Sequence, residues 1–214
     1  SRDPQDLHKT DMAAMACIDP DRRFQDRDNW AWIRDAEKNK LVVGTQCRIL
    51  YQDEEGRMRI ALKFNEMVRN GEIGPVMLGR DHHDVSGTDS PYRETANIKD
   101  GSNVMGEMAI HCFAGNCARG MSLVALHNGG GVGTGKSING GFGLVLDGSE
   151  RVDRIILESM SWDVINGVAR RAWARNDHAI ETVETFNAKR SDGHITLPYI
   201  ADEEYLTELV KNNK

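Results

Sequence analysis

The sequence lacks any apolar run near the roughly 20 residues that a membrane-spanning helix needs, and no signal peptide heads it. We therefore expect a cytoplasmic protein without a membrane partner. Basic residues are in the minority, 27 against 33 acidic ones, and the net charge of -6 argues against nucleic acid as a partner. Cysteines are few, and Cys17, Cys47, Cys112 and Cys117 form no Cys-x-x-Cys pair. We expect reduced, mostly buried thiols and no metal site.

An initiator methionine is also missing. The chain opens on Ser1 and passes directly to Asp3-Pro4, a helix cap followed by proline at the first helical position. We interpret this start as a cut into a longer polypeptide, with a processed terminus as the alternative. The 214 residues are enough to bury a core, and one domain is the expected organisation.

The periodicity of apolar residues predicts the main elements. Helical spacing predicts helices at residues 4–18, 29–38, around 60–68, 103–113, 151–160, 176–187 and 202–211, with Gly71 ending the third. Short apolar runs predict strands at 41–43, 48–51, 75–78, 122–126 and 142–146, a turn at 53–56 and an extended piece at 195–197. Strands that alternate with helices indicate an α/β fold with a mostly parallel sheet and flanking helices.

A loop rich in charged side chains follows the expected buried strand at 75–78. Residues 79–95 include Asp81, His82, His83, Asp84 and Arg93. Ligands of open α/β sheets bind where strands end, so this loop is a candidate reactive site. Its imidazoles and carboxylates suit acid–base chemistry, and an arginine offers a planar fork for a carboxylate. Taken singly, a solvated ion pair or a hydrogen-bonded core histidine explains each residue equally well.

A metal-dependent reading of the same loop is the alternative. Asp81-His82-His83 is similar to a signature of metal-dependent phosphoesterases. Those enzymes also need aspartates on an earlier strand and usually a Gly-Gly-Gly-His segment, in which Val132 takes the place of the histidine here. Adjacent histidines on extended backbone point to opposite sides, which is poor geometry for chelating one ion.

The second strand exit is rich in glycine. Eight glycines lie between Gly129 and Gly143, and residues 130–137 match the phosphate-binding P-loop pattern letter for letter. A P-loop must open a helix, whereas Gly140 and Gly141 follow closely, and each glycine weakens a helix by about 1 kcal/mol. We therefore expect a loop whose amides approach a ligand closely, with a tight turn between buried strands as the alternative. Both loops are expected to face one shared cavity.

Long strings of the sequence resemble the urocanase (urocanate hydratase) family. They lie at residues 43–46, 79–95, 100–102, 125–133, 138–148, 161–164 and 166–171, and they cover most of the chain. In detail they are closer to the longer, animal-like branch than to the common bacterial form.

The resemblance implies a reaction in which water adds across the conjugated side chain of urocanate to give imidazolone propionate. It implies tightly bound NAD⁺ that serves as an electrophile, a homodimer, and a Rossmann-like NAD domain inserted in a core domain. Residues 1–214 then form the C-terminal part of that core domain. The inserted domain is absent, because no Gly-x-Gly-x-x-Gly follows a strand, so NAD⁺ would be bound mainly elsewhere and the isolated piece is expected to be inactive. Gly129, Gly130 and Gly131 resemble the family's glycine contact to NAD⁺.

The resemblance also implies catalytic residues. Asp84 or Asp81 corresponds to the aspartate that handles protons, and the sequence does not decide between them. His83 lies beside them, and Arg93 corresponds to an arginine near the substrate carboxylate.

One position departs from the family pattern. Many bacterial members carry a reactive-site cysteine where this chain has Leu50, and Cys47 would lie on the opposite face of an extended strand. Either that cysteine is dispensable or this branch performs the step differently. A metal phosphoesterase and a non-catalytic dimerising module are the alternative functions.

Overall fold

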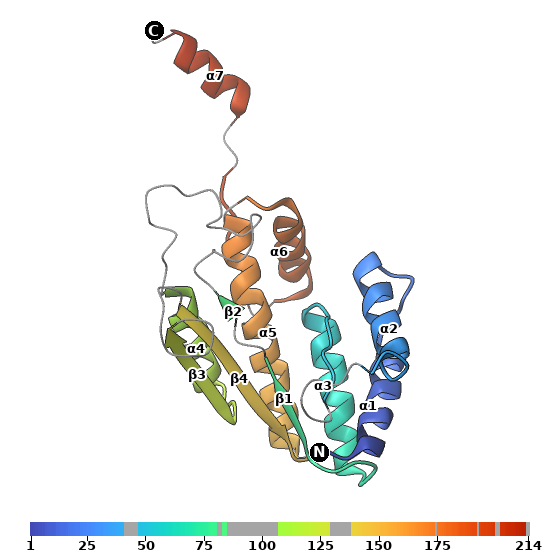
Figure 1. Ribbon diagram of the computed structural model, residues 1–214. Helices are drawn as coiled ribbons and strands as arrows, with labels where there is room; N and C mark the ends of the chain where they lie inside the picture. Colours follow the sequence, from blue (N-terminus) through green and yellow to red (C-terminus); the bar gives the residue numbers. More distant parts are fainter. Residues whose placement is uncertain are drawn as a thin grey trace. The chain divides into compact units, whose positions relative to one another are not determined.

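The computed structural model describes residues 1–40, 47–80, 83–84, 107–128, 138–173, 175–191, 193–199 and 202–212 (Figure 1). They divide into two compact units, Ser1–Asn166 and Gly167–Lys214. In chain order the elements are α1 (Pro4–Cys17), α2 (Phe24–Ala36), α3 (Glu54–Arg69), β1 (Val76–Gly79), β2 (His83–Asp84), α4 (Glu107–Ala118), β3 (Leu123–Asn128), β4 (Ile138–Leu146), α5 (Glu150–Trp173), α6 (Asp177–Lys189) and α7 (Glu203–Asn212). The expected mixture of helices and strands is confirmed.

Side-chain caps define where α1 and α3 begin. Asp3 accepts a hydrogen bond of 2.8 Å from a backbone N–H two residues on, and Pro4 takes the first helical position. Asp53 accepts from the backbone N–H of Gly56 at 2.9 Å. The predicted turn at 53–56 is therefore wrong: the segment is the cap and first turn of α3, whose unpaired N–H groups need such an acceptor.

The expected strand at 48–51 is also wrong. Residues 47–53 have no regular secondary structure, and Leu50 packs against the core. Arg48 forms an ion pair of 2.7 Å with Asp11 of α1, in which both side chains are largely buried. This pair ties the segment to α1.

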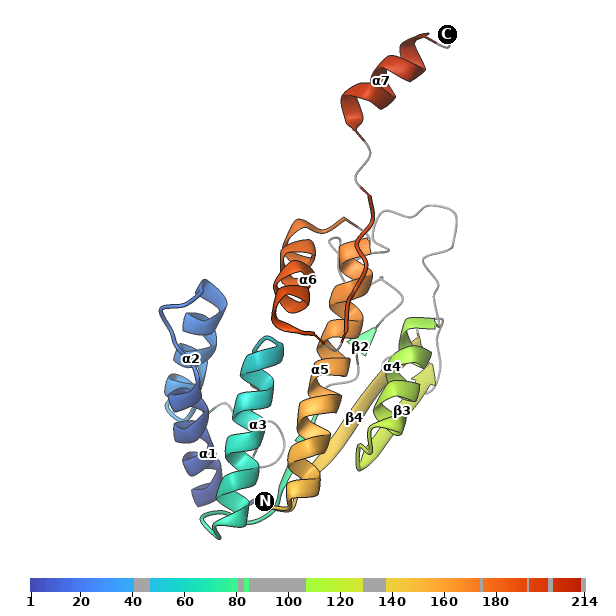
Figure 2. The same cartoon turned by 180° about the vertical axis from the view of Figure 1, so that it is seen from behind.

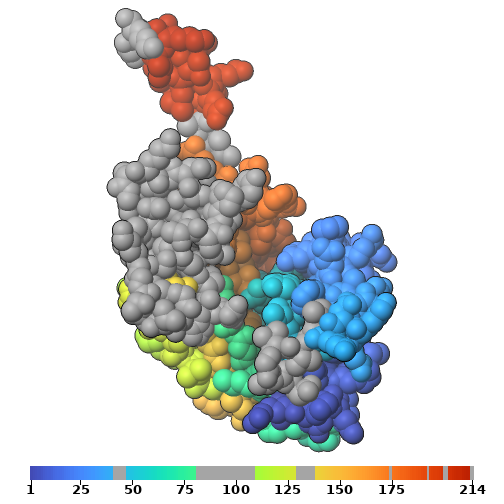
Figure 3. Space-filling view, viewed as in Figure 1, coloured from blue at the N-terminus to red at the C-terminus, as the bar shows by residue number. Residues whose placement is uncertain are grey.

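Helix α2 begins at Phe24, earlier than predicted. In the space-filling view α1 and α2 form a continuous blue surface (Figure 3).

β4 is the central strand of the described sheet. Its Gly143 pairs with Gly79 of β1 and with Leu123 of β3. A strand has two edges, so β3 lies on one edge of β4 and β1 on the other. Asn139 likewise pairs with Asp84 of β2 and with β3, which places β2 on the same edge as β1.

All of these pairings are antiparallel, so the prediction of a mostly parallel sheet is wrong for the described strands. A parallel neighbour needs a crossover connection of about a dozen residues or more, usually a helix. β3 and β4 instead form a hairpin, in which Asn128 faces Ile138. β1 and β3 both run opposite to β4, so their carboxyl ends still point toward the same end of the sheet.

Three helices cover one face of the sheet. Alternate residues of β4, from Phe142 to Leu146, pack against α5, and the contacts of α3 and α4 lie on the same face (Figure 2). Met77 of β1 and Val145 of β4 belong to the other face and are 52% and 41% exposed. β1 is therefore half-buried on one face and exposed on the other, in contrast to the buried strand that was expected.

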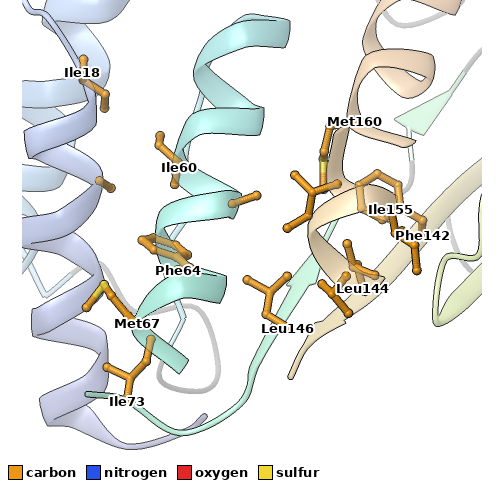
Figure 4. Close-up of a cluster of buried hydrophobic side chains, with 14 of the residues drawn as sticks. Ile18, Ile60, Phe64, Met67, Ile73, Phe142, Leu144, Leu146, Ile155 and Met160 are labelled. Atoms are coloured by element: carbon orange, nitrogen blue, oxygen red, sulfur yellow. The ribbon is translucent and has the colours of Figure 1, made fainter. Parts of the chain in front are cut away.

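One core cluster joins α1, α3, β4 and α5. Figure 4 shows Phe64 of α3 on the side of α1, and Leu144 and Leu146 of β4 beside Ile155 of α5. Leu144 and Leu146 are 1% and 0% exposed. Helical and strand periodicity therefore converge on a single apolar layer.

A buried asparagine ties α3 to the turn between β4 and α5. Asn65 accepts a hydrogen bond of 2.8 Å from the backbone N–H of Gly148 and donates to Ser149 O at 3.0 Å and to Asp153 Oδ1 at 2.7 Å. Gly148 has a positive φ of 84° and lies against Arg69, so a side chain there would be strained. Arg69 also forms an ion pair with Asp153.

The second unit contains the end of α5, α6 and α7. Its small core consists of Ala172, Ala179 and Val183. Asn187 holds the extended piece near 195–197 through two hydrogen bonds of 2.8 Å with the backbone of Ile195. The helices predicted here are confirmed, and α5 continues well past the predicted end at residue 160. None of the described helices has the length and apolarity to span a membrane.

Candidate functional site

The charged loop begins where β1 ends. Of its predicted site residues, the structure describes the backbone of His83 and Asp84, which form β2. Asp81, Arg93 and the glycines at 129–131 lie outside the described residues, so their roles stay predictions.

Strand pairing brings the two strand exits to one place. Asp84 pairs with Asn139 of β4, and Asn139 pairs on its other edge with His127 of β3. His127 and Asn128 are the last residues before the glycine loop, and Asn128 faces Ile138 just after it. Two strand spacings of about 4.8 Å put the backbones of Asp84 and His127 about 10 Å apart. Both strand exits therefore lie at one end of the sheet, whereas the shared cavity expected of the two loops lies outside the described residues and stays a prediction.

The register slips by one residue between β1 and β2. Gly79 pairs with Gly143 and His83 with Gly140, so one edge takes four steps where β4 takes three. This displacement decides which residue of β2 faces Asn139. Without it, His83 and not Asp84 would stand opposite Asn139.

The P-loop alternative is excluded by the element that comes after the glycines. β4 begins at Ile138, directly after Ser137, where a P-loop requires a helix N-terminus. The glycine segment therefore connects two antiparallel strands. Among the described residues, no group of histidine, cysteine, aspartate or glutamate side chains is arranged to hold a metal ion.

A buried charged cluster lies where Arg80 leaves β1. Arg80 Nη1 is 2.6 Å from Asp163 Oδ1, and Arg57 Nη1 is 3.8 Å from Asp163 Oδ2. Cys112 of α4 donates its S–H to Asp163 Oδ1 at 3.4 Å, and Asn116 donates to Cys112 Sγ at 3.5 Å. We call these five residues the Asp163 cluster. It joins α3, α4 and α5 to the start of the charged loop.

Burial dominates the electrostatics of the cluster. The side chain of Asp163 is 1% exposed and faces two guanidinium groups, those of Arg57 and Arg80. Partial burial and the nearby Arg80 lower the pKa of Arg57 from its ordinary value. Burial, with the carboxylate of Asp163 beside it, raises the pKa of the Cys112 thiol to about 12. Cys112 is therefore a protonated donor and not a nucleophile.

A close helix contact fixes α4 against α5 next to this cluster. A Cβ on Gly115 would lie 1.9 Å from Trp162 Nε1, so α4 needs glycine there. The guanidinium of Arg119 stacks over the Trp162 ring, 4.4 Å from its centroid. Trp162 immediately precedes Asp163, so the contact also fixes the backbone that carries the carboxylate.

The cysteines differ from expectation. All four are free, as predicted, but Cys112 alone is buried, whereas Cys47 and Cys117 are exposed. Cys47 lies in an irregular segment and not on a strand, and the side chain of Leu50 contacts the core.

Sequence reasoning missed the Asp163 cluster. Residues 161–164 belong to one of the family-like strings, but the predicted helix ends at 160, so Asp163 had no predicted surroundings. Residues 57, 80, 112 and 163 are far apart in the chain, and no spacing rule joins them.

Comparison with known proteins identifies the chain. Residues 1–185 match the model of the urocanase C-terminal domain family. The chain belongs to the urocanase family. The charged loop, the glycine segment and the Asp163 cluster of this chain all lie within the matched residues.

Individual relatives support the assignment. The chain is 48% identical to urocanate hydratase of Mus musculus over 221 residues, which cover 99% of this chain and 33% of the relative. It is 50% identical to a probable urocanate hydratase of Caenorhabditis elegans and 48% identical to urocanate hydratase of Homo sapiens, covering 96% and 95% of this chain and 32% of each relative. The resemblance inferred from the sequence is confirmed. The chain spans about a third of the length of these relatives.

Proposed function

We propose that this chain forms the C-terminal part of the catalytic core of a urocanate hydratase, which adds water to urocanate to give imidazolone propionate. The observation that carries the proposal is identity of 48–50% to urocanate hydratases along 95–99% of the chain. A homodimeric assembly in the cytoplasm is part of the proposal, and it is supported by the family resemblance.

Within this enzyme the charged loop supplies the catalytic groups. Asp84 or Asp81 transfers protons with His83 beside them, and Arg93 binds the substrate carboxylate through its planar guanidinium. The pairing of Asp84 with Asn139, in line with the end of β3, supports a role at the sheet end where both loops leave.

The glycine loop is proposed to hold NAD⁺ through Gly129, Gly130 and Gly131. When bound, NAD⁺ supplies a cationic ring that withdraws electron density from the imidazole of urocanate. The described residues fit this assignment, because Asn128 and Ile138 pair at the base of the loop, one row from Asp84. The rest of the enzyme would bind most of the cofactor.

Leu50 bears on which groups take part. Leucine carries no nucleophilic group, and this side chain packs against the core. We propose that this branch performs the reaction without a cysteine at that position.

The test uses the complete enzyme with NAD⁺. The near-ultraviolet absorbance of urocanate should disappear without any external hydride acceptor, and chelators should have no effect. Arg93→Lys should raise KM about tenfold or more, because an ammonium cannot form the bidentate contact. Arg34→Lys is the control, because Arg34 forms an exposed ion pair with Asp35.

Unchanged urocanate absorbance in the complete protein would contradict the proposed function. Unchanged kinetics in Arg93→Lys would remove Arg93 alone from the site. Activity that manganese restores and chelator abolishes would favour the phosphoesterase alternative, and turnover by the 214-residue chain alone would show that no further part is needed.

A further inference from the structure

Arg80 directly follows β1 at the start of the charged loop, and it is held from two directions. Its backbone N–H donates to Phe142 O of β4 at 3.0 Å, which continues the pairing of β1. Its guanidinium reaches Asp163 of α5, with Nη1 2.6 Å from Oδ1 and 3.4 Å from the backbone O. The chain is therefore fixed to both the sheet and the helix layer immediately after β1.

Asp163 is itself firmly placed. It lies in the middle of α5, beside the Trp162–Gly115 contact, and receives the S–H of Cys112 from α4. Its side chain is almost completely buried, and Oδ2 has no hydrogen-bond donor among the described residues. A buried carboxylate of this kind is expensive unless a cation accompanies it, so Asp163 holds Arg80 strongly in place.

The location of this anchor has a consequence for register. Arg80 stays opposite Phe142, in the register of β1, while β2 is displaced by one residue. The two registers on β4 therefore differ by one residue between Arg80 and Asp84, and Arg80 belongs to the register of β1. Without this anchor, the one-residue difference in register could move into β1. It could also disappear, which would bring His83 opposite Asn139.

We propose that Asp163 is a positioning residue that acts through Arg80 to hold Asp84 opposite Asn139, at the sheet end where the glycine loop begins. The proposal rests on the proposed function for its effect on catalysis, and on strand pairing for its effect on structure. Asp163 is not proposed to touch the substrate.

The test compares Asp163→Asn, Arg80→Met and their double variant in the complete enzyme. Each single variant should lower kcat for urocanate by about 10- to 100-fold and change KM by less than about threefold, because misplacement of a reacting group affects the chemical step. The double variant should be no worse than either single one, because both remove the same anchor.

A matched pair elsewhere serves as control. Arg69 and Asp153 form another ion pair, between α3 and α5, but they are not attached to the charged loop. Arg69→Met and Asp153→Asn should lower the melting temperature and leave kcat within about twofold of the wild type, as expected of a purely structural pair.

Amide hydrogen exchange in residues 79–84 gives a readout that does not depend on activity. It should be faster in Asp163→Asn and Arg80→Met than in the wild type, and unchanged in Asp153→Asn. If the wild-type enzyme consumes no urocanate, the proposed function fails, whereas the exchange comparison still decides the positioning role.

Wild-type kcat and exchange in the single variants would overturn the proposal, as would a loss of kcat without faster exchange, or additive losses in the double variant. If the single variants do not fold because one buried charge is left unpaired, the double variant decides, since it removes both charges. A folded double variant with wild-type exchange in residues 79–84 would equally overturn it.

Discussion

The contact between Gly115 and Trp162 gives a sharp test of the helix packing. In Gly115→Ala the new Cβ would lie 1.9 Å from Trp162 Nε1 and 2.0 Å from Cε2. An ordinary contact is 3.4 Å or more, so α4 and α5 must separate, or the ring must move, by about 1.5 Å. The ring is rigid and Arg119 is stacked on it, so neither movement is easy.

The magnitude is set by two opposing effects. Overpacking a fitted contact costs about 1–3 kcal/mol, and the required shift puts this site at the upper end. Alanine is a better helix former than glycine by about 1 kcal/mol, which offsets part of the loss. We expect Gly115→Ala to lower the free energy of unfolding by about 2 kcal/mol.

The assay is urea denaturation of the 214-residue chain followed by circular dichroism. Gly167→Ala is the control, since it is also inside a helix but its Cβ would meet the flexible end of Arg171, at 3.1 Å. That variant should be neutral or stabilised by up to about 1 kcal/mol. The loss in Gly115→Ala should shrink when Trp162→Leu is added. A Gly115→Ala chain as stable as the wild type would refute the assigned contact.

Three further predictions concern stability and reactivity. The pKa of Asp26 is lowered by hydrogen bonds from Arg23 and Arg22, so its stabilisation is full above its ordinary pKa of 3.8 and is lost as pH falls further. Thermal melts between pH 5 and pH 2 should accordingly be less pH-dependent in Asp26→Asn than in the wild type. With a pKa of about 12, roughly one Cys112 thiol in ten thousand is ionised at pH 8, so alkylation should label Cys47 and leave Cys112 unmodified until the chain unfolds. Asn65→Ala should lower the free energy of unfolding by about 3 kcal/mol, because it removes the three hydrogen bonds that the Asn65 side chain makes. A variant as stable as the wild type in urea denaturation would contradict this role of Asn65.

Local features of the fold could be predicted from the sequence. Asp3-Pro4 and Gly71 are predictive because an aspartate cap, a proline and a glycine each favour a particular local backbone conformation. The structure confirms a capped start of α1 and a positive φ of 70° after α3. At 48–51 the local pattern gave a wrong prediction, because contacts with distant residues decide the structure there. Its apolar residues suit a strand, but Arg48 and Leu50 are held by Asp11 and the core, and no neighbouring described strand is paired with them.

Strand direction could not be predicted in the same way. The alternation of strands and helices in the sequence predicted helical crossover connections between parallel strands. In the structure β3 and β4 instead form an antiparallel hairpin, and β4 runs between the other strands. The two strand exits nevertheless lie at one end of the sheet, because β1 and β3 are both antiparallel to β4. Family resemblance supplied the candidate residues, and it assigned no role to Asp163, whose partners come from separate segments of the chain.

The offset between β1 and β2 bears on how this part of the gene can vary. Deleting one residue between Gly79 and His83 would leave three steps on this edge against three on β4, so Asp84 would stay opposite Asn139 in a regular ladder. Inserting one residue would instead give five steps against three and leave a second residue without a partner on β4. We therefore expect this segment to tolerate shortening by one residue better than lengthening.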